Sequence, residues 1–203
     1  MRPLDRLSVA PDSAVLAHEA GHLVIGLELA LHEGGIEFLM TPGTEVARAH
    51  YNGTGATNRK RIVRAFAGMY VQAILEPNSI SDKLRASILN ISLVEDYGDD
   101  VARRCIPADI VTHGFQGDWI DSMLLAEIAD KQSPSRVARN CLVRLRRIVN
   151  SGGLVPIASL VAKNAQTWLA TDDPDVSFSH TLIYPVQRAR EIFASWRQRL
   201  VGQ

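Results

Sequence analysis

Cysteine is scarce in this 203-residue chain, which contains only Cys105 and Cys141. Two cysteines are too few for a disulfide framework, and we therefore expect a reducing, cytoplasmic environment. The chain also lacks any stretch that approaches the ~18 uninterrupted apolar residues of a membrane span. Its charged first residues show no signal peptide. These absences predict a cytoplasmic protein with no membrane span.

An excess of charge of one sign is absent as well. The 22 basic and 22 acidic side chains cancel, which excludes a globally basic nucleic-acid-binding protein, and we expect no nucleic acid partner. No G-x-x-x-x-G-K-[ST] sequence occurs, so we expect no ATP binding through a phosphate loop. With 46% apolar and 22% charged residues, the chain can build a real core. Its length fits one domain over residues 1–203.

Apolar residues recur at helical spacing over most of the chain and predict a mainly α (α+β) fold. The first predicted helix covers 14–31, with Asp12 or Ser13 as its cap and the Gly34-Gly35 pair as its end. Short strands at 36–40 and 46–51 flank Thr41-Pro42-Gly43-Thr44 and predict a β-hairpin whose second strand lies at an edge. Further helices are expected at 61–75, 82–93, 118–131, 135–150, 155–170 and 185–201, with an acidic turn at 95–100.

The segment His18-Glu19-Ala20-Gly21-His22 lies inside the first predicted helix and matches the pattern H-E-x-x-H. Residues four apart face the same side of a helix, so both imidazoles can reach one metal ion. Zinc suits imidazole ligands and keeps an open position for water in catalytic sites. Glu19 is then placed to accept a proton from that water as general base. Because a buried histidine or glutamate needs a polar partner, the apolar context favours a metal site.

Two histidines leave a zinc ion one protein ligand short. The extended pattern H-E-x-x-H-x-x-G-x-x-H is excluded, because the chain has Ile25 and Glu28 where glycine and histidine are required. The third ligand must therefore come from another element. Spacing alone leaves these candidates open: His32, His50, His113, Glu37, Glu45, Asp99, Asp100 and Asp118.

The zinc helix, followed by Leu23 and Val24, resembles the H-E-A-G-H-x-x-V of the FtsH-type peptidases, the zinc protease domain of membrane-anchored AAA+ proteases. The order of the elements agrees, since a β-hairpin follows that helix in the family. A helix with a motif like A-G-R-A-A-E-E comes next, here 67–73, where Met69, Gln72 and Ala73 replace the charged residues. The resemblance covers about residues 14–129.

The family's next motif, T-G-A-S-N-D-L, contains an aspartate that is the third zinc ligand and opens a helix. The best match is the segment 112–119, which keeps the glycine four residues ahead of the aspartate and implies Asp118 as the ligand. Asp100 is the rival, because it lies nearer the family's usual spacing. An ordinary helix cap is the alternative role for Asp118. The resemblance thus implies a zinc-binding core over 1–131 and a C-terminal helical part over 132–203.

What the resemblance implies is an ATP-independent zinc metallopeptidase that hydrolyses flexible or unfolded protein segments, without the AAA+ ATPase module or the membrane anchor. His18, His22 and Asp118 would bind Zn2+, and Glu19 would be the catalytic general base. A separate unfoldase or a homo-oligomer is a possible partner besides the protein or peptide substrate. Two alternatives stay open: a regulatory H-E-x-x-H protease that cuts one specific partner, and a non-catalytic zinc-stabilised interaction module.

One further feature is the basic predicted helix over 135–150, with five arginines (Arg136, Arg139, Arg144, Arg146 and Arg147) and no acidic residue. We expect a solvated helix face there, with docking to an acidic partner or nucleic acid as the alternative. The three tryptophans fall at or beside helical apolar positions and are expected in the core.

Overall fold

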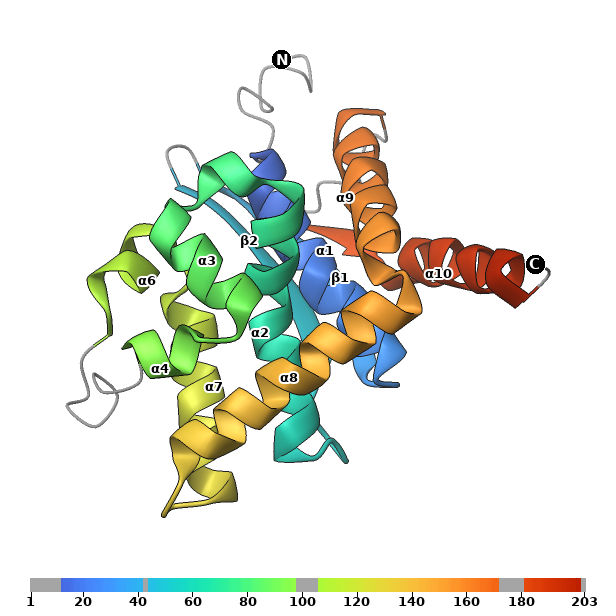
Figure 1. The fold of residues 1–203 in the computed structure, drawn as a ribbon. Helices are drawn as coiled ribbons and strands as arrows, with labels where there is room; N and C mark the ends of the chain where they lie inside the picture. Colours follow the sequence, from blue (N-terminus) through green and yellow to red (C-terminus); the bar gives the residue numbers. More distant parts are fainter. Residues whose placement is uncertain (1–11, 42–43, 98–105, 172–180, 202–203) are drawn as a thin grey trace.

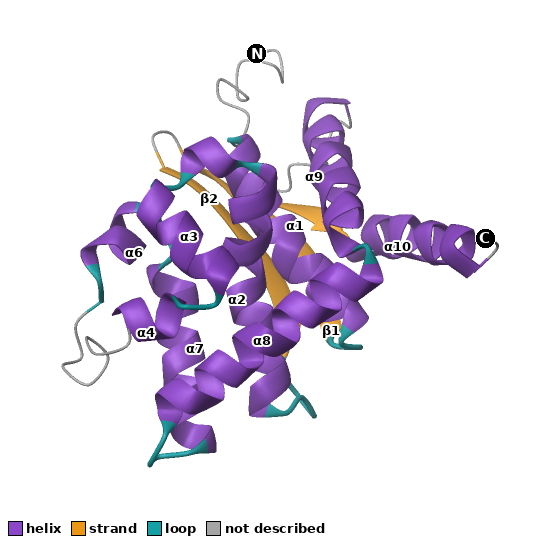
Figure 2. Ribbon diagram, in the orientation of Figure 1, coloured by secondary structure: helices purple, strands orange, loops and turns teal. Residues whose placement is uncertain are grey.

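The computed structural model describes residues 12–41, 44–97, 106–171 and 181–201. The described chain is mainly helical, with a small three-stranded antiparallel sheet, which confirms the predicted mainly α (α+β) class (Figure 2). Its elements are α1 (Ser13–Glu28), β1 (His32–Thr41), β2 (Thr44–Asn52), α2 (Asn58–Leu75), a 3-10 turn (Pro77–Ser79), α3 (Asp82–Asn90), α4 (Leu93–Tyr97), α6 (Ala108–Thr112), α7 (Gln116–Ala129), α8 (Pro134–Gly152), α9 (Leu154–Thr171), β3 (Thr181–Pro185) and α10 (Val186–Val201).

Helix α1 lies at the centre of the molecule, with α2 and α9 against it and the sheet behind it in Figure 1. The Asp12 carboxylate caps its first turn by accepting a hydrogen bond from the Ala14 N–H at 3.1 Å. The predicted end of this helix was wrong. It ends at Glu28, because Ala30 adopts a left-handed backbone (φ +53°) and turns the chain into β1. The Gly34-Gly35 pair instead lies inside β1, where the strand register shifts.

The predicted hairpin is confirmed: β1 and β2 pair antiparallel from His32↔Asn52 to Thr41↔Thr44. The strand order is β2-β1-β3, so β2 is an edge strand, as expected. Strand β3 was not predicted. It pairs antiparallel with β1 and alternates buried Leu182 and Tyr184 with exposed Ile183. The C-terminal part of the chain therefore completes the sheet that lies beside α1.

Close contact between α1 and α2 determines the geometry of the candidate site. At Gly21 of α1 an added Cβ would lie 2.8 Å from the Ala67 carbonyl oxygen of α2, closer than real Cβ atoms approach. Large apolar side chains such as Leu23 and Phe66 fill the core around this crossing. Helix α7 packs against α2 and α8, and α8 crosses the front of the molecule in Figure 1.

Several boundaries differ from the sequence prediction. The helix expected at 82–93 is divided, because Ile91 ends α3 in a left-handed conformation (φ +65°) and α4 follows. Residues 95–97 of the expected acidic turn belong to α4, while Asp99 and Asp100 lie outside the described residues. All five arginines of α8 are exposed, in keeping with a solvated face. Trp119 and Trp168 are buried as expected, and Trp196 is half-buried. No helix among the described residues has the length and apolar character needed to cross a membrane.

Candidate metal centre

Three side chains from two helices converge beside α2. His18 and His22 lie one turn apart on α1, and Asp118 lies in the first turn of α7. Asp118 Oδ2 is 2.7 Å from His18 Nε2, and Asp118 Oδ1 is 3.3 Å from His22 Nε2. The two Nε2 atoms are 3.0 Å apart. The structure thus brings together the three residues that the sequence and the resemblance assigned to a metal.

Helix α7 delivers Asp118 through its own packing. Trp119 and Met123 are buried, which fixes the helix against the body of the protein. Phe115, at the residue before α7, lies against His18, with ring centroids 5.3 Å apart and an interplanar angle of 11°. Asp118 makes no capping hydrogen bond, so the cap role is not its role here. The same turn of chain therefore supplies both a carboxylate and an apolar wall for His18.

The second nitrogen of each imidazole is held by α2. His18 Nδ1 is 3.1 Å from Gln72 Oε1, and His22 Nδ1 is 2.8 Å from the Arg64 carbonyl oxygen. Because both partners are oxygen acceptors, each Nδ1 donates a hydrogen, and each Nε2 faces the centre, where its lone pair becomes available to a metal once any proton on it is lost. Metal-binding histidines are commonly oriented by such partners, which fix the ring and its tautomer. Sequence reasoning missed both positioning contacts.

Space for the two imidazoles comes from Gly68 of α2. A Cβ at this position would lie 2.4 Å from His22 Nε2 and 2.6 Å from His18 Nε2. The only sequence signal for this role was the Ala67-Gly68 pair of the family-like motif. Any larger residue would place its side chain where the ligand atoms meet.

The electrostatics of the three groups are strongly coupled. Burial acts to lower the pKa of His18, but the adjacent Asp118 carboxylate outweighs it and raises that pKa to about 9. Burial acts to raise the pKa of Asp118, but the two imidazoles outweigh it and hold that pKa far below its usual range. Without a metal, the cluster is therefore an ion pair at neutral pH, and a cation must displace a proton to bind.

These residues fit a metal ion. Their ligand atoms all lie within 4.8 Å of one another, and the group could hold a divalent cation. Ligands held about 2 Å from a tetrahedral ion are roughly 3.3 Å apart, close to the separations seen here. Two imidazole nitrogens and a carboxylate oxygen are a donor set that zinc accepts, and three protein ligands leave a fourth position open.

Glu19 lies beside this group without belonging to it. Its side chain is buried, and Oε2 accepts a hydrogen bond of 2.5 Å from the Ala49 N–H of β2. Its negative charge also raises the pKa of His18, by less than the Asp118 carboxylate does. The carboxylate is thus close to the ligands and fixed by the edge strand.

The other third-ligand candidates that the structure describes lie elsewhere. His50 pairs with Glu37 across the hairpin. His113 donates from Nδ1 to the Asp109 carbonyl and accepts at Nε2 from the Ser81 N–H, which joins two loops. His32 is exposed, and the side chain of Glu45, like Asp99 and Asp100, falls outside what the structure describes.

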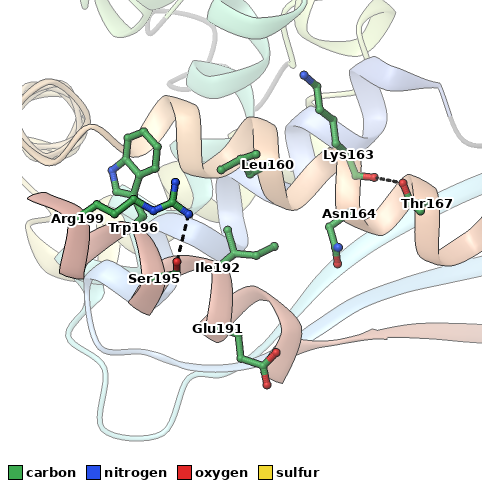
Figure 3. Close-up of a pocket in the computed structure, with 9 residues that line it drawn as sticks. All are labelled: Leu160, Lys163, Asn164, Thr167, Glu191, Ile192, Ser195, Trp196 and Arg199. Atoms are coloured by element: carbon green, nitrogen blue, oxygen red, sulfur yellow. Dashed lines mark hydrogen bonds between the residues drawn. The ribbon is translucent and has the colours of Figure 1, made fainter.

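One hollow of the described surface lies away from this centre. It lies between α9 and α10, has a volume of about 520 Å³ and shares no residue with the His18 group. Leu160 and Ile192 contribute apolar surface to it, and Trp196 and Arg199 border it (Figure 3). No cluster of metal ligands faces it among the described residues. The chemistry suggested by the sequence is therefore located at the converging helices rather than in this hollow.

Comparison with protein-family models, with curated proteins and with solved structures finds no match to this chain. The resemblance to FtsH-type peptidases therefore depends on the motif residues and the order of the elements alone.

Proposed function

We propose that this chain is a zinc metallopeptidase of the FtsH type that hydrolyses peptide bonds in flexible or unfolded protein segments. The observation that supports this most directly is the meeting of Asp118 with the H-E-x-x-H pair. About one hundred residues separate them in the sequence, yet their ligand atoms lie 2.7 to 3.3 Å apart. No phosphate loop occurs in these 203 residues, so the proposed reaction is independent of ATP.

His18, His22 and Asp118 would hold the zinc ion. When bound, the ion supplies a Lewis acid that polarises the scissile carbonyl and lowers the pKa of water. Glu19 takes a proton from the attacking water and passes it to the leaving amine. Its hydrogen bond from Ala49 holds one carboxylate oxygen, and the other accepts no hydrogen bond that the described residues provide.

The edge strand β2 places the substrate. Edge strands can pair with an extended peptide through their free main-chain groups. At Ala49 both main-chain groups are occupied, because the N–H donates to Glu19 and the carbonyl accepts from Arg64. An extended substrate would therefore pair with β2 at residues other than Ala49, and the two bonds at Ala49 would stay in place beside the general base.

The test is cleavage of casein, an unfolded protein, by wild type and by Glu19→Gln, with zinc content measured in both. We expect Glu19→Gln to retain zinc and to lose turnover by roughly a hundredfold or more. Glu127→Gln, an exposed carboxylate on α7, is the matched control and should cleave at the wild-type rate. Undiminished cleavage by Glu19→Gln would refute the mechanism. A wild-type protein that binds zinc but cleaves nothing would favour the non-catalytic interaction module.

A further inference from the structure

A buried ion pair next to the candidate centre has no part in the mechanism above. Arg64 of α2 donates from Nε to Glu33 Oε1 at 2.7 Å and from Nη2 to Glu33 Oε2 at 2.9 Å. The Glu33 side chain is 0% exposed and the Arg64 side chain 7%. Burying such a pair carries a desolvation cost that apolar residues of similar volume avoid, so stability alone does not explain it.

Helix α1, which carries His18 and His22, provides the space for this ion pair. A Cβ at Gly26 of α1 would lie 1.8 Å from Glu33 Oε1, so the carboxylate occupies the space of a missing side chain. Gly26 is one turn beyond His22 on the same face of α1. The Glu33 carboxylate thus packs against α1 at Gly26, one turn beyond His22.

Besides its ion pair with Glu33, Arg64 contacts both the strand that holds Glu19 and the candidate metal ligand His22. Its Nη2 also donates to the Ala49 carbonyl at 2.9 Å, and the N–H of Ala49 holds Glu19. Its own main-chain carbonyl accepts from His22 Nδ1 at 2.8 Å. The Arg64 side chain therefore contacts the strand that holds the general base, whereas its backbone contacts a metal ligand.

A second contact strengthens the hold of α2 on the edge strand. The Arg64 guanidinium lies over the Tyr51 ring, 4.2 Å from its centroid. The Tyr51 hydroxyl accepts from Arg61 Nε at 3.0 Å. Arg61 and Arg64 of α2 thus both contact Tyr51 of β2, and Arg64 also donates a hydrogen bond to Ala49 of the same strand.

We propose that Arg64, held by its ion pair with Glu33, is a positioning residue that fixes the β2 edge at Ala49 and thereby orients Glu19, separately from metal binding. This inference deepens the proposed peptidase function and rests on it. In this proposal the Arg64 side chain orients the general base Glu19 through Ala49, and the Arg64 main-chain carbonyl orients His22. Substitution of the side chain leaves the carbonyl in place, so turnover and metal affinity separate.

The test compares Arg64→Lys with wild type. Lysine keeps the charge beside Glu33 but lacks the planar fork that reaches two carboxylate oxygens and a carbonyl together. We expect exchange of the Ala49 amide hydrogen, followed by NMR, to become roughly tenfold faster or more. We expect kcat on casein to fall roughly tenfold to a hundredfold, as for a misplaced catalytic group. Zinc affinity and KM should stay at wild-type values.

An apolar replacement of the pair, Arg64→Met with Glu33→Leu, provides the second variant, since it removes both charges and avoids an unpaired one. It should show the same faster exchange at Ala49 and the same loss of kcat. The control replaces the exposed pair Arg139 and Glu95 in the same way, with no change expected in exchange, kcat or zinc affinity.

The outcomes distinguish this inference from the proposed function. Wild-type exchange at Ala49 in both variants overturns the inference, whatever the activity. Zinc affinity that falls together with kcat also overturns it, because the pair would then support the ligands rather than the base. If Glu19→Gln cleaves as well as wild type, the peptidase proposal fails, while the exchange of Ala49 still decides whether Arg64 holds the strand.

Discussion

Substitution of Gly68 by alanine tests the metal centre directly. The new Cβ would lie 2.4 Å from His22 Nε2 and 2.6 Å from His18 Nε2, whereas ordinary contacts begin about 1 Å farther away. Separation of the two helices would open the packed core at their crossing, where Leu23 and Phe66 are fully buried. The imidazoles must therefore turn away, and their Nδ1 hydrogen bonds to Gln72 and Arg64 must weaken.

The expected loss is in metal affinity rather than in folding. Disturbed outer partners of metal-binding histidines typically cost 10- to 100-fold in affinity, and here both ligands are displaced. We therefore expect zinc to bind about a hundredfold more weakly, which corresponds to about 2.7 kcal/mol. Alanine favours a helix over glycine by up to about 1 kcal/mol, so the helical circular dichroism should persist. Competition with a chromophoric chelator measures the affinity.

Gly117→Ala is the matched control. This glycine lies in α7, one residue before Asp118, and an added Cβ there meets no atom within 4 Å. Zinc affinity should remain that of wild type, and the unfolding free energy should rise by up to about 1 kcal/mol. A folded Gly68→Ala protein that binds zinc as tightly as Gly117→Ala would refute the assignment of the metal to this cluster.

Three further predictions concern protons and buried groups. Because the pKa of His18 is raised to about 9, zinc binding near pH 7.5 should release close to one proton, which calorimetry in buffers of different ionisation enthalpy detects. For the same reason the metal-free protein should lose stability as the pH rises from 6.5 through 9. Zinc binding without proton release would contradict this. Burial raises the pKa of Cys141 to about 11, so in a Cys105→Ser background iodoacetamide should label it only after unfolding, and rapid native labelling would be the contrary result. The buried Ser122 hydroxyl has no hydrogen-bond partner among the described residues, so Ser122→Ala should raise the unfolding free energy in urea by about 1 kcal/mol, whereas a clear decrease would reveal a partner.

Much of the fold was accessible from local signals. Apolar periodicity located the long helices to within a few residues, and the Pro42-Gly43 pair marked the hairpin. Strand β3 gave no such signal, because a five-residue strand has too few positions to establish alternation and depends on β1 as its partner. The end of α1 was missed for another reason: the left-handed turn occurs at Ala30, where the sequence offers a glycine pair only four residues later.

The candidate site shows the same division. His18, Glu19 and His22 are a local pattern on one helix, so helical spacing alone brings the two imidazoles together. Asp118 reaches them only because α7 packs on α2, a contact between distant segments that spacing cannot specify. The role of Arg64 was missed for a related reason, because its side chain acts on Glu33 and Ala49, which belong to other elements.

The departures from the family-like motif on α2 have a physical explanation in the structure. Met69 and Ala73 are buried in the core, where charged side chains would be costly without partners. Gln72 faces the site instead, accepting from His18 and donating from Nε2 to Ser79 Oγ. A neutral amide at this position keeps the charge of the proposed centre balanced, since a doubly charged cation would be offset by Asp118 and Glu19 alone. A carboxylate there would add an uncompensated negative charge in a buried site, so the replacement of an acidic residue by glutamine is consistent with a metal-binding centre that retains its general base.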